Sequence, residues 1–299
     1  MPPASAPEQQ VVLVTGCTKG GIGWHLCAQL AARGARVFAT ARRVPAMEGL
    51  AERGCRLLAL DVTDSGSVRR AVAAIVEEAG RIDVVVNNAG IATRKPAVDF
   101  TDEEVRALFD VNYFGMVAVN DAVLPHMIKQ RSGKVFNIGS GLGYCTLPMM
   151  SHYSATKHAA RAYSDVLRME LCPFGVRVCF VAPGYIRTHI GDERHDLPPG
   201  SLYHAFPRLA RAMAESVFLG TTYEAATPAD TFCSALARVV LSRAPPRHYR
   251  SGHLSWFPWL MSMITALWVL DLSYGLRFGL MPNSMVGRRR GGLAASKAQ

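Results

Sequence analysis

The sequence predicts an α/β fold in which one doubly wound parallel sheet of about seven strands, ordered 3-2-1-4-5-6-7, carries helices on both faces. Short apolar runs alternate with longer amphipathic stretches across residues 10–181, which is the pattern of repeated βαβ units. The apolar runs are continuous, as expected for parallel strands that are buried on both faces. With 299 residues, of which 49% are hydrophobic, the chain is long enough to bury such a core.

The individual elements follow from these runs in chain order. Apolar runs predict strands at residues 11–15, 36–40, 57–60, 84–86, 134–138 and 176–181. Apolar residues at helical spacing predict helices at residues 24–33, 65–79, 101–130 and 153–171. The motifs of chemical interest lie where the strands end, and sheets of this kind bind ligands at the carboxyl ends of their strands.

The composition excludes several classes of protein. The net charge is +10, but the basic residues are mostly dispersed among acids and no aromatic-basic stripe is present, so nucleic-acid binding is not expected. The seven cysteines are scattered and form no Cys-x-x-Cys pair, which predicts reduced thiols in a cytosol-facing protein and no metal site. Residues 1–10 hold neither a basic residue nor an apolar core, so no secretory signal is expected.

A glycine-rich segment, Gly16-Cys17-Thr18-Lys19-Gly20-Gly21-Ile22-Gly23, joins the first strand to the first helix. Glycines let the backbone approach a pyrophosphate, and the helix N-terminus supplies N–H donors. The structural alternative is a plain turn with close helix–sheet packing. The second strand ends in Ala41-Arg42-Arg43, without the acid that would bond the ribose 2′-hydroxyl of NAD. Arg42, assisted by Lys19, therefore predicts NADP(H), although these basic residues would also suit a solvated loop.

Tyr153 and Lys157 are four residues apart in a predicted helix, and Ser140 lies thirteen residues before Tyr153. Positions i and i+4 share one helix face, so phenol and ammonium can be directed at one point. A nearby cation lowers the pKa of a phenol and makes it usable for proton transfer. Ser140 would hold a substrate carbonyl or hydroxyl oxygen. Tyr-x-x-x-Lys by itself is common in amphipathic helices, so its surroundings decide its meaning.

In these surroundings the chain resembles the short-chain dehydrogenase/reductase family, which has a Rossmann-type fold. The resemblance spans residues 10–250 and rests on Thr15 to Gly23, Asp61-Val62, Asn87-Asn88-Ala89-Gly90, Asn112, Ser140, Tyr153 with Lys157, and Pro183-Gly184 with Thr188. The glycine loop, Ala-Arg-Arg and the C-terminal third look like the fungal NADPH-dependent 1-acyldihydroxyacetone-phosphate reductase branch. That likeness implies reduction of a lipid-borne ketone at the endoplasmic reticulum or lipid droplets. It also implies a homo-oligomer, dimer or tetramer.

The family resemblance implies a role for each matching residue. Tyr153 is expected to be the general acid in reduction, and Lys157 to lower its pKa and hold the nicotinamide ribose. Ser140 would polarise the substrate oxygen, and Asn112 would support a proton relay through water. Cofactor contacts are expected from Tyr153, Lys157, Thr15, Gly16, Thr18, Lys19, Gly21, Ile22, Gly23, Arg42, Asp61, Val62, Asn88, Ala89, Gly90, Pro183, Gly184, Ile186 and Thr188. The structural alternatives are a turn residue at Ser140, a helix-bonded amide at Asn112 and a sheet brace at Asn88.

The chain is expected to divide into a flexible N-terminus (1–9), a dinucleotide-binding and catalytic domain (10–250), a hydrophobic segment (251–281) and a basic tail (282–299). A substrate lid is expected at 189–228, where apolar residues recur at helical spacing: Leu202, Phe206, Leu209, Met213 and Val217. Residues 254–270 are uncharged, hold three Trp and fall short of the 20 or so residues of a spanning helix. An interfacial membrane contact is expected there, or else packing on the domain or an oligomer interface.

The sequence therefore predicts an NADPH-dependent reductase of a ketone on an apolar or lipid-like substrate. Two other functions stay open. One is a secondary-metabolite ketone or aldehyde reductase or alcohol dehydrogenase. The other is a catalytically silent nucleotide-binding scaffold, which would have no need of Ser140, Tyr153 and Lys157 together.

Overall fold

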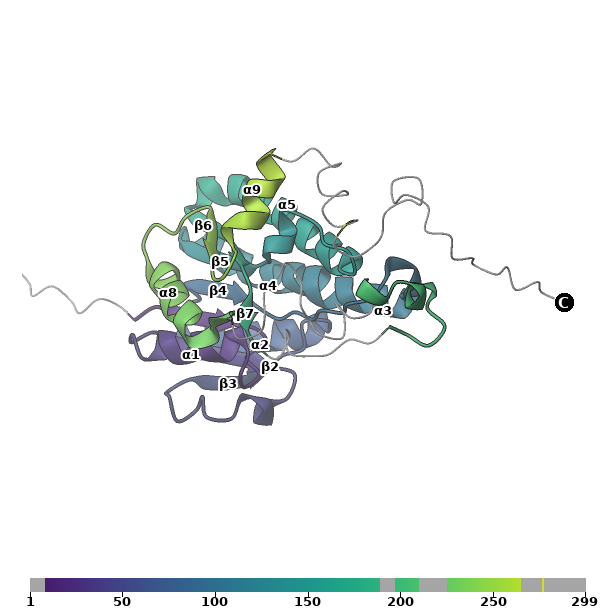
Figure 1. Ribbon diagram of the computed structural model, residues 1–299. Coiled ribbons are helices and arrows are strands. Elements are labelled where there is room, and N and C mark those ends of the chain that lie inside the picture. Colours follow the sequence, from purple (N-terminus) through teal and green to yellow (C-terminus); the bar gives the residue numbers. More distant parts are fainter. Residues whose placement is uncertain (1–8, 189–196, 210–224, 265–275, 277–299) are drawn as a thin grey trace, which may run out of the picture.

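The computed structural model describes residues 9–188, 197–209, 225–264 and 276, and its centre is a seven-stranded sheet (Figure 1). All neighbouring strands pair in parallel. In sheet order the strands are β3 (Arg56–Ala59), β2 (Arg36–Ala41), β1 (Val11–Val14), β4 (Val84–Asn87), β5 (Gly133–Ile138), β6 (Val176–Pro183) and β9 (His248–Ser251). The predicted doubly wound topology is confirmed, and the seventh strand is β9.

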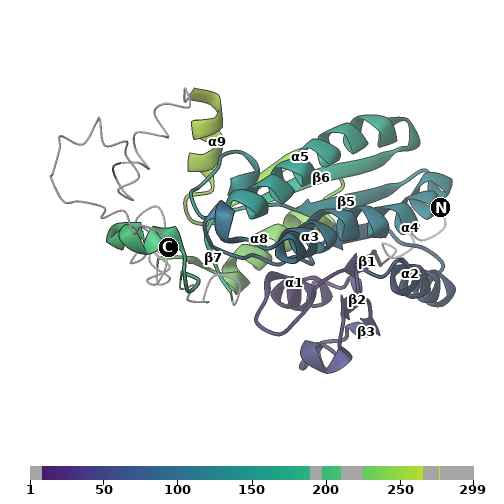
Figure 2. The ribbon, with the colours of Figure 1, turned by 90° about the vertical axis from the view of Figure 1, so that its right-hand side faces the viewer.

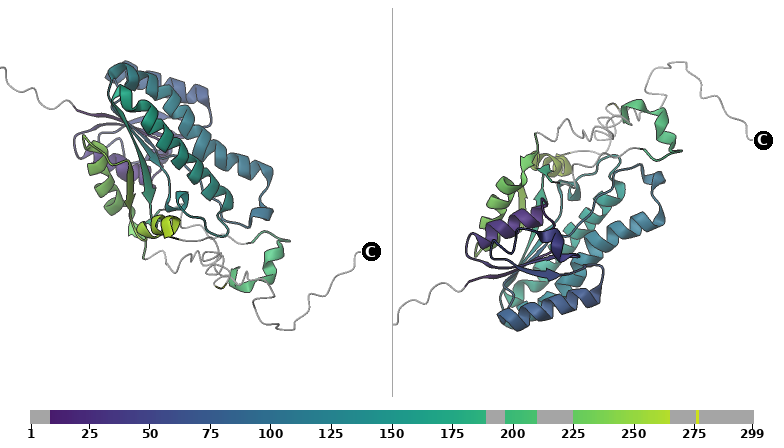
Figure 3. Two further views of the ribbon diagram at one scale, coloured as in Figure 1. Left: turned by 90° about the horizontal axis from the view of Figure 1, so that it is seen from above. Right: turned by 90° about the horizontal axis from the view of Figure 1, so that it is seen from below.

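Helices cover both faces of the sheet (Figure 2). Successive residues of a strand point to opposite faces, so Val12 and Val14 pack with α1 (Ile22–Ala31) and α8 (Ala229–Leu241), whereas Leu13 packs on the opposite side. That opposite side is covered by α2 (Ser65–Ala79), α4 (Gly115–Gln130) and α5 (Ser151–Leu171), which are seen from above and below in Figure 3. Short 3₁₀ turns connect these elements at Val44–Met47, Ala97–Asp99, Gly141–Gly143 and Cys172–Phe174.

The helix predicted at 101–130 is interrupted by a π-helical turn. α3 (Asp102–Phe109) begins at a capping box between Thr101 and Glu104, and the π turn occupies Asp110–Phe114 before α4. The segment Asp102–Gln130 has 29 residues, and a stretch of 18 residues within it has a mean hydropathy of 1.2, so by length and composition alone it could cross a membrane. Its apolar side, however, packs against α2 and the sheet. This is therefore a core helix of the domain.

The expected lid, 189–228, lies partly outside the described residues. Within them, β7 (Ile186–Arg187) pairs with β8 (Thr227–Pro228), and a 3₁₀ turn spans Leu202–Ala205. Leu209 is fully buried, but Leu202 is 81% exposed. Leu202 is therefore not buried with Leu209, because it lies in a 3₁₀ turn that ends before Phe206. Met213 and Val217 lie outside the described residues.

The segment predicted at 254–270 begins as helix α9 (Trp256–Ile264), and residues 265–270 lie outside the described part. One side of α9 packs on the domain: Pro258 is buried against Gly141, and Trp259 joins a cluster around Tyr144 and Phe180. The other side is open, with Trp256 56% and Met263 68% exposed. The helix thus combines packing on the domain with an exposed apolar side. The basic tail lies outside the described residues.

Candidate active site

The glycine loop is shaped by contacts that exclude side chains. Gly16 has a φ of +72°, which favours glycine, and a Cβ there would lie 2.7 Å from Cα of Ala89. A Cβ on Gly23 would lie 2.6 Å from Nδ2 of Asn88 and 2.7 Å from the Gly16 oxygen. Gly21 caps α1 without a side-chain hydrogen bond, and the first turn of α1 carries no acid. This positive helix end and the bare backbone fit a pyrophosphate group.

Asn88 and Thr15 brace this loop against the end of β4. Nδ2 of Asn88 donates to the carbonyl oxygens of Thr15 and Gly16, both at 2.9 Å. In return, Oγ1 of Thr15 accepts from the backbone N–H groups of Asn88 at 3.0 Å and Ala89 at 3.1 Å. Four hydrogen bonds thus fix the loop beside the next strand. The structural role proposed for Asn88 is therefore present in the geometry.

The ends of β2 and β3 carry the residues expected around adenosine. Arg42 directly follows β2 and is exposed. Lys19 lies in an exposed ion pair with Glu48 at 3.0 Å, and such a pair is weak enough for a phosphate to compete for the cation. Oδ1 of Asp61 accepts from the backbone N–H and the hydroxyl of Thr63, at 2.9 and 2.7 Å. Val62 packs against Gly115 of α4 and is 7% exposed.

Ser140, Tyr153 and Lys157 converge where β5 ends and α5 begins. Burial raises the pKa of Tyr153, while a hydrogen bond with Ser140 and, next, the charge of Arg94 act to lower it. Oγ of Ser140 also accepts from the Leu142 N–H at 3.1 Å, which fixes its direction at the start of a 3₁₀ turn. The turn role and the position beside the phenol are therefore compatible for Ser140.

Lys157 is 5% exposed, and its Nζ lies 5.5 Å from the ring centroid of Tyr153. Nζ donates to the carbonyl oxygen of Ile138 at the end of β5, at 3.1 Å. Burial lowers the pKa of Lys157 to about 8. The ammonium is thus held under the phenol ring by β5, and it loses its charge as the pH rises through mildly alkaline values.

Asn112 lies in the π turn, a distortion that often marks functional sites. Its Oδ1 accepts from the Ile91 N–H at 2.8 Å, and its Nδ2 donates to the Ile91 carbonyl at 2.9 Å and to Oγ1 of Thr156 at 3.2 Å. Thr156 in turn donates to the Tyr153 carbonyl at 2.7 Å. The amide therefore ties the chain after β4 to the catalytic helix, whatever further role it has in proton transfer.

The chain after β6 closes the site opposite α5. Gly184 donates to the Ser251 carbonyl at 2.9 Å, and a Cβ there would meet the His253 oxygen. Ile186 and Thr188 are buried, at 7% and 8% exposure.

Gly90 lies between Asn112 and Lys157, since a Cβ on it would be 3.2 Å from Oδ1 and 3.7 Å from Nζ. Thr18 is exposed at the glycine loop, and its carbonyl accepts from the Gly21 N–H at 3.0 Å.

Two features near the site were not predicted from the sequence. Arg94 lies in the loop after β4, where no spacing rule marks it, and its charge acts to lower the pKa of Tyr153. Tyr144, four residues after Ser140, shares a hydrogen bond of 2.5 Å with Nδ1 of His248, whose Nε2 lies 2.7 Å from Asp165 of α5. These two hydrogen bonds connect the chain after the Ser140 turn with β9 and α5. Its members are far apart in sequence, and only the fold brings them into contact.

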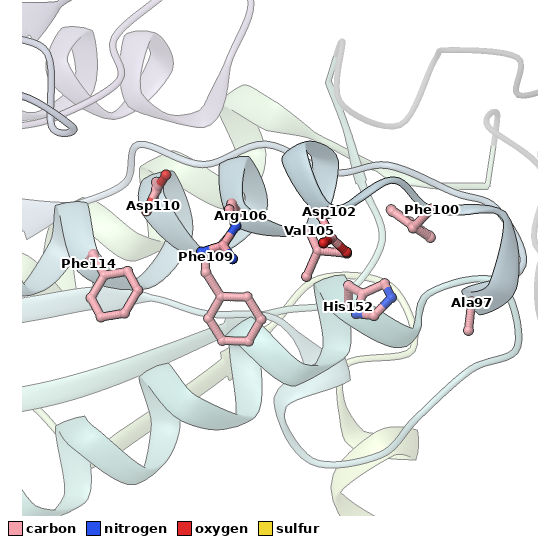
Figure 4. Close-up of a pocket in the computed structure, with 9 residues that line it drawn as sticks. All are labelled: Ala97, Phe100, Asp102, Val105, Arg106, Phe109, Asp110, Phe114 and His152. Atoms are coloured by element: carbon pink, nitrogen blue, oxygen red, sulfur yellow. The ribbon is translucent and has the colours of Figure 1, made fainter.

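His152, the neighbour of Tyr153, faces a separate groove between α3 and the start of α5 (Figure 4). The ring of His152 stacks edge-on with Phe100 at 4.7 Å between centroids. The groove is also lined by Val105, Phe109 and Phe114 and contains none of the predicted catalytic residues. Within the described part of the chain, no group of His, Cys, Asp and Glu is arranged to hold a metal ion.

A doubly wound sheet with a glycine loop after β1 and a Ser–Tyr–Lys cluster after β5 defines a nicotinamide-dependent oxidoreductase acting on CH-OH or carbonyl groups. The family model "short chain dehydrogenase" matches residues 10–197, and the chain belongs to that family.

Similar proteins include two that are named as reductases of lipids and a fungal short-chain dehydrogenase. An NADPH-dependent 1-acyldihydroxyacetone phosphate reductase of Schizosaccharomyces pombe is 35% identical over 67% of this chain and 70% of its own. A 3-ketodihydrosphingosine reductase of Bacteroides thetaiotaomicron is 39% identical over 63% and 68%. The short-chain dehydrogenase ptmH of Penicillium ochrochloron is 34% identical over 86% and 94%.

Solved structures agree with the fold. A short-chain dehydrogenase from Streptomyces avermitilis superposes with a TM-score of 0.75 at 27% identity, covering 92% of this chain and 98% of that one. A gluconate 5-dehydrogenase from Burkholderia cenocepacia, solved in complex with NADP and tartrate, has a TM-score of 0.64 at 27% identity, with coverages of 78% and 88%.

Proposed function

We propose that the protein is an NADPH-dependent reductase of a ketone on an apolar or lipid-like substrate, similar in activity to 1-acyldihydroxyacetone-phosphate reductase. The observation that carries this proposal is the convergence of Ser140, Tyr153 and Lys157 beside the glycine loop. Support for a lipid substrate comes from two relatives whose names specify acyldihydroxyacetone phosphate and ketodihydrosphingosine.

The bound cofactor would supply the hydride, so the protein's own residues have to orient the carbonyl and provide a proton. The hydroxyl of Ser140 would donate to the substrate oxygen. The phenol of Tyr153 is protonated at neutral pH, because burial raises its pKa, and it can transfer its proton to that oxygen. Lys157 stabilises the resulting phenolate as long as its ammonium is charged. Asn112 links α5 to the chain after β4 through its hydrogen bond to Thr156.

NADPH is proposed over NADH because β2 ends at an exposed guanidinium, Arg42, where the other cofactor would be matched by an acid. The relative from Schizosaccharomyces pombe is NADPH-dependent by name, and the gluconate 5-dehydrogenase structure contains NADP. The glycine loop would hold the pyrophosphate at the N-terminus of α1, with Asn88, Ala89, Gly90 and Asp61 nearer the adenosine.

The alternative function, a secondary-metabolite ketone or aldehyde reductase or alcohol dehydrogenase, would use the same cluster of Ser140, Tyr153 and Lys157. A silent nucleotide-binding scaffold is disfavoured, because a scaffold gains nothing from a buried lysine beneath a half-buried phenol.

We also propose that the protein contacts a membrane from the cytosolic side, at the endoplasmic reticulum or lipid droplets, and that it forms a homo-oligomer. The exposed side of α9, with Trp256 and Met263, supports the membrane contact. Fractionation without detergent tests it, and recovery of all the protein in the high-speed supernatant would contradict the membrane contact.

The reductase proposal is tested by following NADPH oxidation with acyldihydroxyacetone phosphate, steroid ketones, polyketide ketones and small soluble aldehydes. We expect turnover with the lipid ketone, and we expect Tyr153→Phe to abolish turnover while the variant still binds NADPH. Activity on the small aldehydes alone would remove the lipid hypothesis. Near-wild-type turnover by Tyr153→Phe would refute the mechanism.

A further inference from the structure

An apolar cluster borders the part of the site that would hold the reacting oxygen. Its members, here termed the Tyr153 cluster, are the buried side chains of Leu147, Met149, Met150, Leu197 and Leu209. The ring of Tyr153 packs against this cluster, and so does Leu142, whose N–H donates to Oγ of Ser140 at 3.1 Å. A hydrocarbon group attached to a carbonyl between Ser140 and Tyr153 would therefore contact this cluster.

Two members of the Tyr153 cluster come from residues 197–209, the described part of the expected lid, here termed the lid segment. Leu197 begins the lid segment at 8% exposure, and Leu209 ends it at 0%. Between them the chain is mostly exposed, and Leu202 is 81% exposed. The lid segment thus contacts the site with its two ends, while most of its middle faces solvent.

One polar contact fixes the lid segment between these ends. Ser201 is 8% exposed, and its Oγ donates to Oδ2 of Asp99 at 2.6 Å. The same Oγ accepts from the Tyr203 N–H at 3.2 Å, which fixes the direction of the hydroxyl. Asp99 ends the 3₁₀ turn Ala97–Asp99, which lies outside the lid segment. This bond therefore holds the lid segment to the chain between β4 and α3.

A hydrocarbon chain that enters the Tyr153 cluster has to displace the two leucines of the lid segment. Moving apolar side chains from a buried place into water costs free energy in proportion to their area. A ligand recovers that free energy only when it buries apolar surface of its own in the same place. We propose that Leu197 and Leu209 are specificity-determining residues, which occupy the Tyr153 cluster until a hydrocarbon chain attached to the reducible carbonyl displaces them. This inference rests on the proposed reductase function and adds where the apolar part of the substrate binds.

The kinetic test uses 2-hexanone, 2-octanone and 2-decanone, three uncharged ketones that differ only in chain length. With the full-length enzyme and NADPH, kcat/KM should rise about fourfold for each added methylene group, as the burial of that group predicts. Leu209→Ala removes apolar surface that each ketone has to displace. It should therefore lower KM for all three ketones about tenfold at unchanged kcat, although the variant is less stable. Leu197→Ala, the second variant, should act in the same direction.

Two further variants examine the lid segment itself. Leu202→Ala is the matched control, because it makes the same change at an exposed position of the lid segment, and it should alter neither KM nor stability. Ser201→Ala removes the bond to Asp99 and should lower KM about two- to tenfold at unchanged kcat, because the lid segment is then displaced more easily. Asp99→Asn keeps an oxygen that can accept from Ser201 and should stay close to the wild type. A higher KM for Ser201→Ala would contradict the displacement.

A binding measurement makes the result independent of turnover. The enzyme with NADPH is titrated with 2-hexanol, 2-octanol and 2-decanol, which the reduced cofactor cannot oxidise. Their affinity should rise with chain length and rise again in Leu209→Ala, while melting temperature and NADPH affinity show whether each variant is folded. Affinities independent of chain length, or weaker binding to folded Leu209→Ala and Leu197→Ala, would overturn the proposal. Binding that increases with chain length and in both variants, without turnover of any ketone, would refute the reductase function and leave the displacement of the leucines standing.

Discussion

Replacing Asn88 by alanine should destabilise the fold and loosen the glycine loop at once. The substitution removes two hydrogen bonds of 2.9 Å, to the carbonyls of Thr15 and Gly16. A net contribution of about 1 kcal/mol for each bond, with the added cost of carbonyls left without a donor, gives a loss of about 2–4 kcal/mol in the free energy of unfolding. At about 2–4 °C per kcal/mol, the melting temperature should fall by about 5–15 °C.

The assay is urea unfolding followed by circular dichroism, with dinucleotide affinity measured by fluorescence. Asn88→Asp is the informative companion, because it keeps the side-chain size but turns a donor into an acceptor facing two carbonyls, so it should be at least as destabilising as Asn88→Ala. A loss below about 0.5 kcal/mol for Asn88→Ala, or a stable Asn88→Asp, would refute the reasoning, because it would mean that the two carbonyls do not depend on this amide.

Three further predictions concern charge and the Ser140 turn. Arg42→Ala should raise the KM for NADPH about tenfold or more with little effect on NADH, and equal losses for both would contradict the cofactor assignment. Burial lowers the pKa of Lys157 to about 8, so its ammonium loses its proton as the pH rises through about 8. The rate of carbonyl reduction should decline over that pH range. Lys157→Arg keeps its charge and should retain a residual rate without that decline. Tyr144→Phe leaves Nδ1 of His248 without its 2.5 Å partner and should cost about 1–3 kcal/mol of stability, a difference that should largely vanish in a His248→Phe background.

The sequence predicted those parts of the structure that depend on local pattern. Six strands were located from short apolar runs, and Tyr153 and Lys157 share a helix face because four residues make about one turn. The strand β9 was not located, because its sequence, His-Tyr-Arg-Ser, is polar and lies at the edge of the sheet, where one side needs no apolar partner. The π turn at Asn112 was not predicted either, because no periodic pattern marks it and the Asn112 side chain bonds to Ile91, twenty-one residues away.

The site residues that were missed share one property: their partners come from other elements. The charge of Arg94 acts on Tyr153 from a loop that is bonded to Asn112 at Ile91 and to Met149 at Lys95. Likewise, His248 meets Tyr144 and Asp165 across sequence separations of 104 and 83 residues. Such contacts leave no periodic signal in the chain, so only the folded structure reveals them.

The contact between Pro258 and Gly141 has a consequence for building chimeras from members of this family. A Cβ on Gly141 would lie 2.9 Å from Cγ of Pro258. Helix α9 therefore packs directly on Gly141, the residue after Ser140, and a side chain at position 141 would prevent that packing. A C-terminal segment transplanted from a relative therefore has to bring its own residue at position 141 with it. A chimera that keeps this contact has to exchange residue 141 and the C-terminal segment together. The two are more than a hundred residues apart, so a single crossover point in the sequence cannot achieve this.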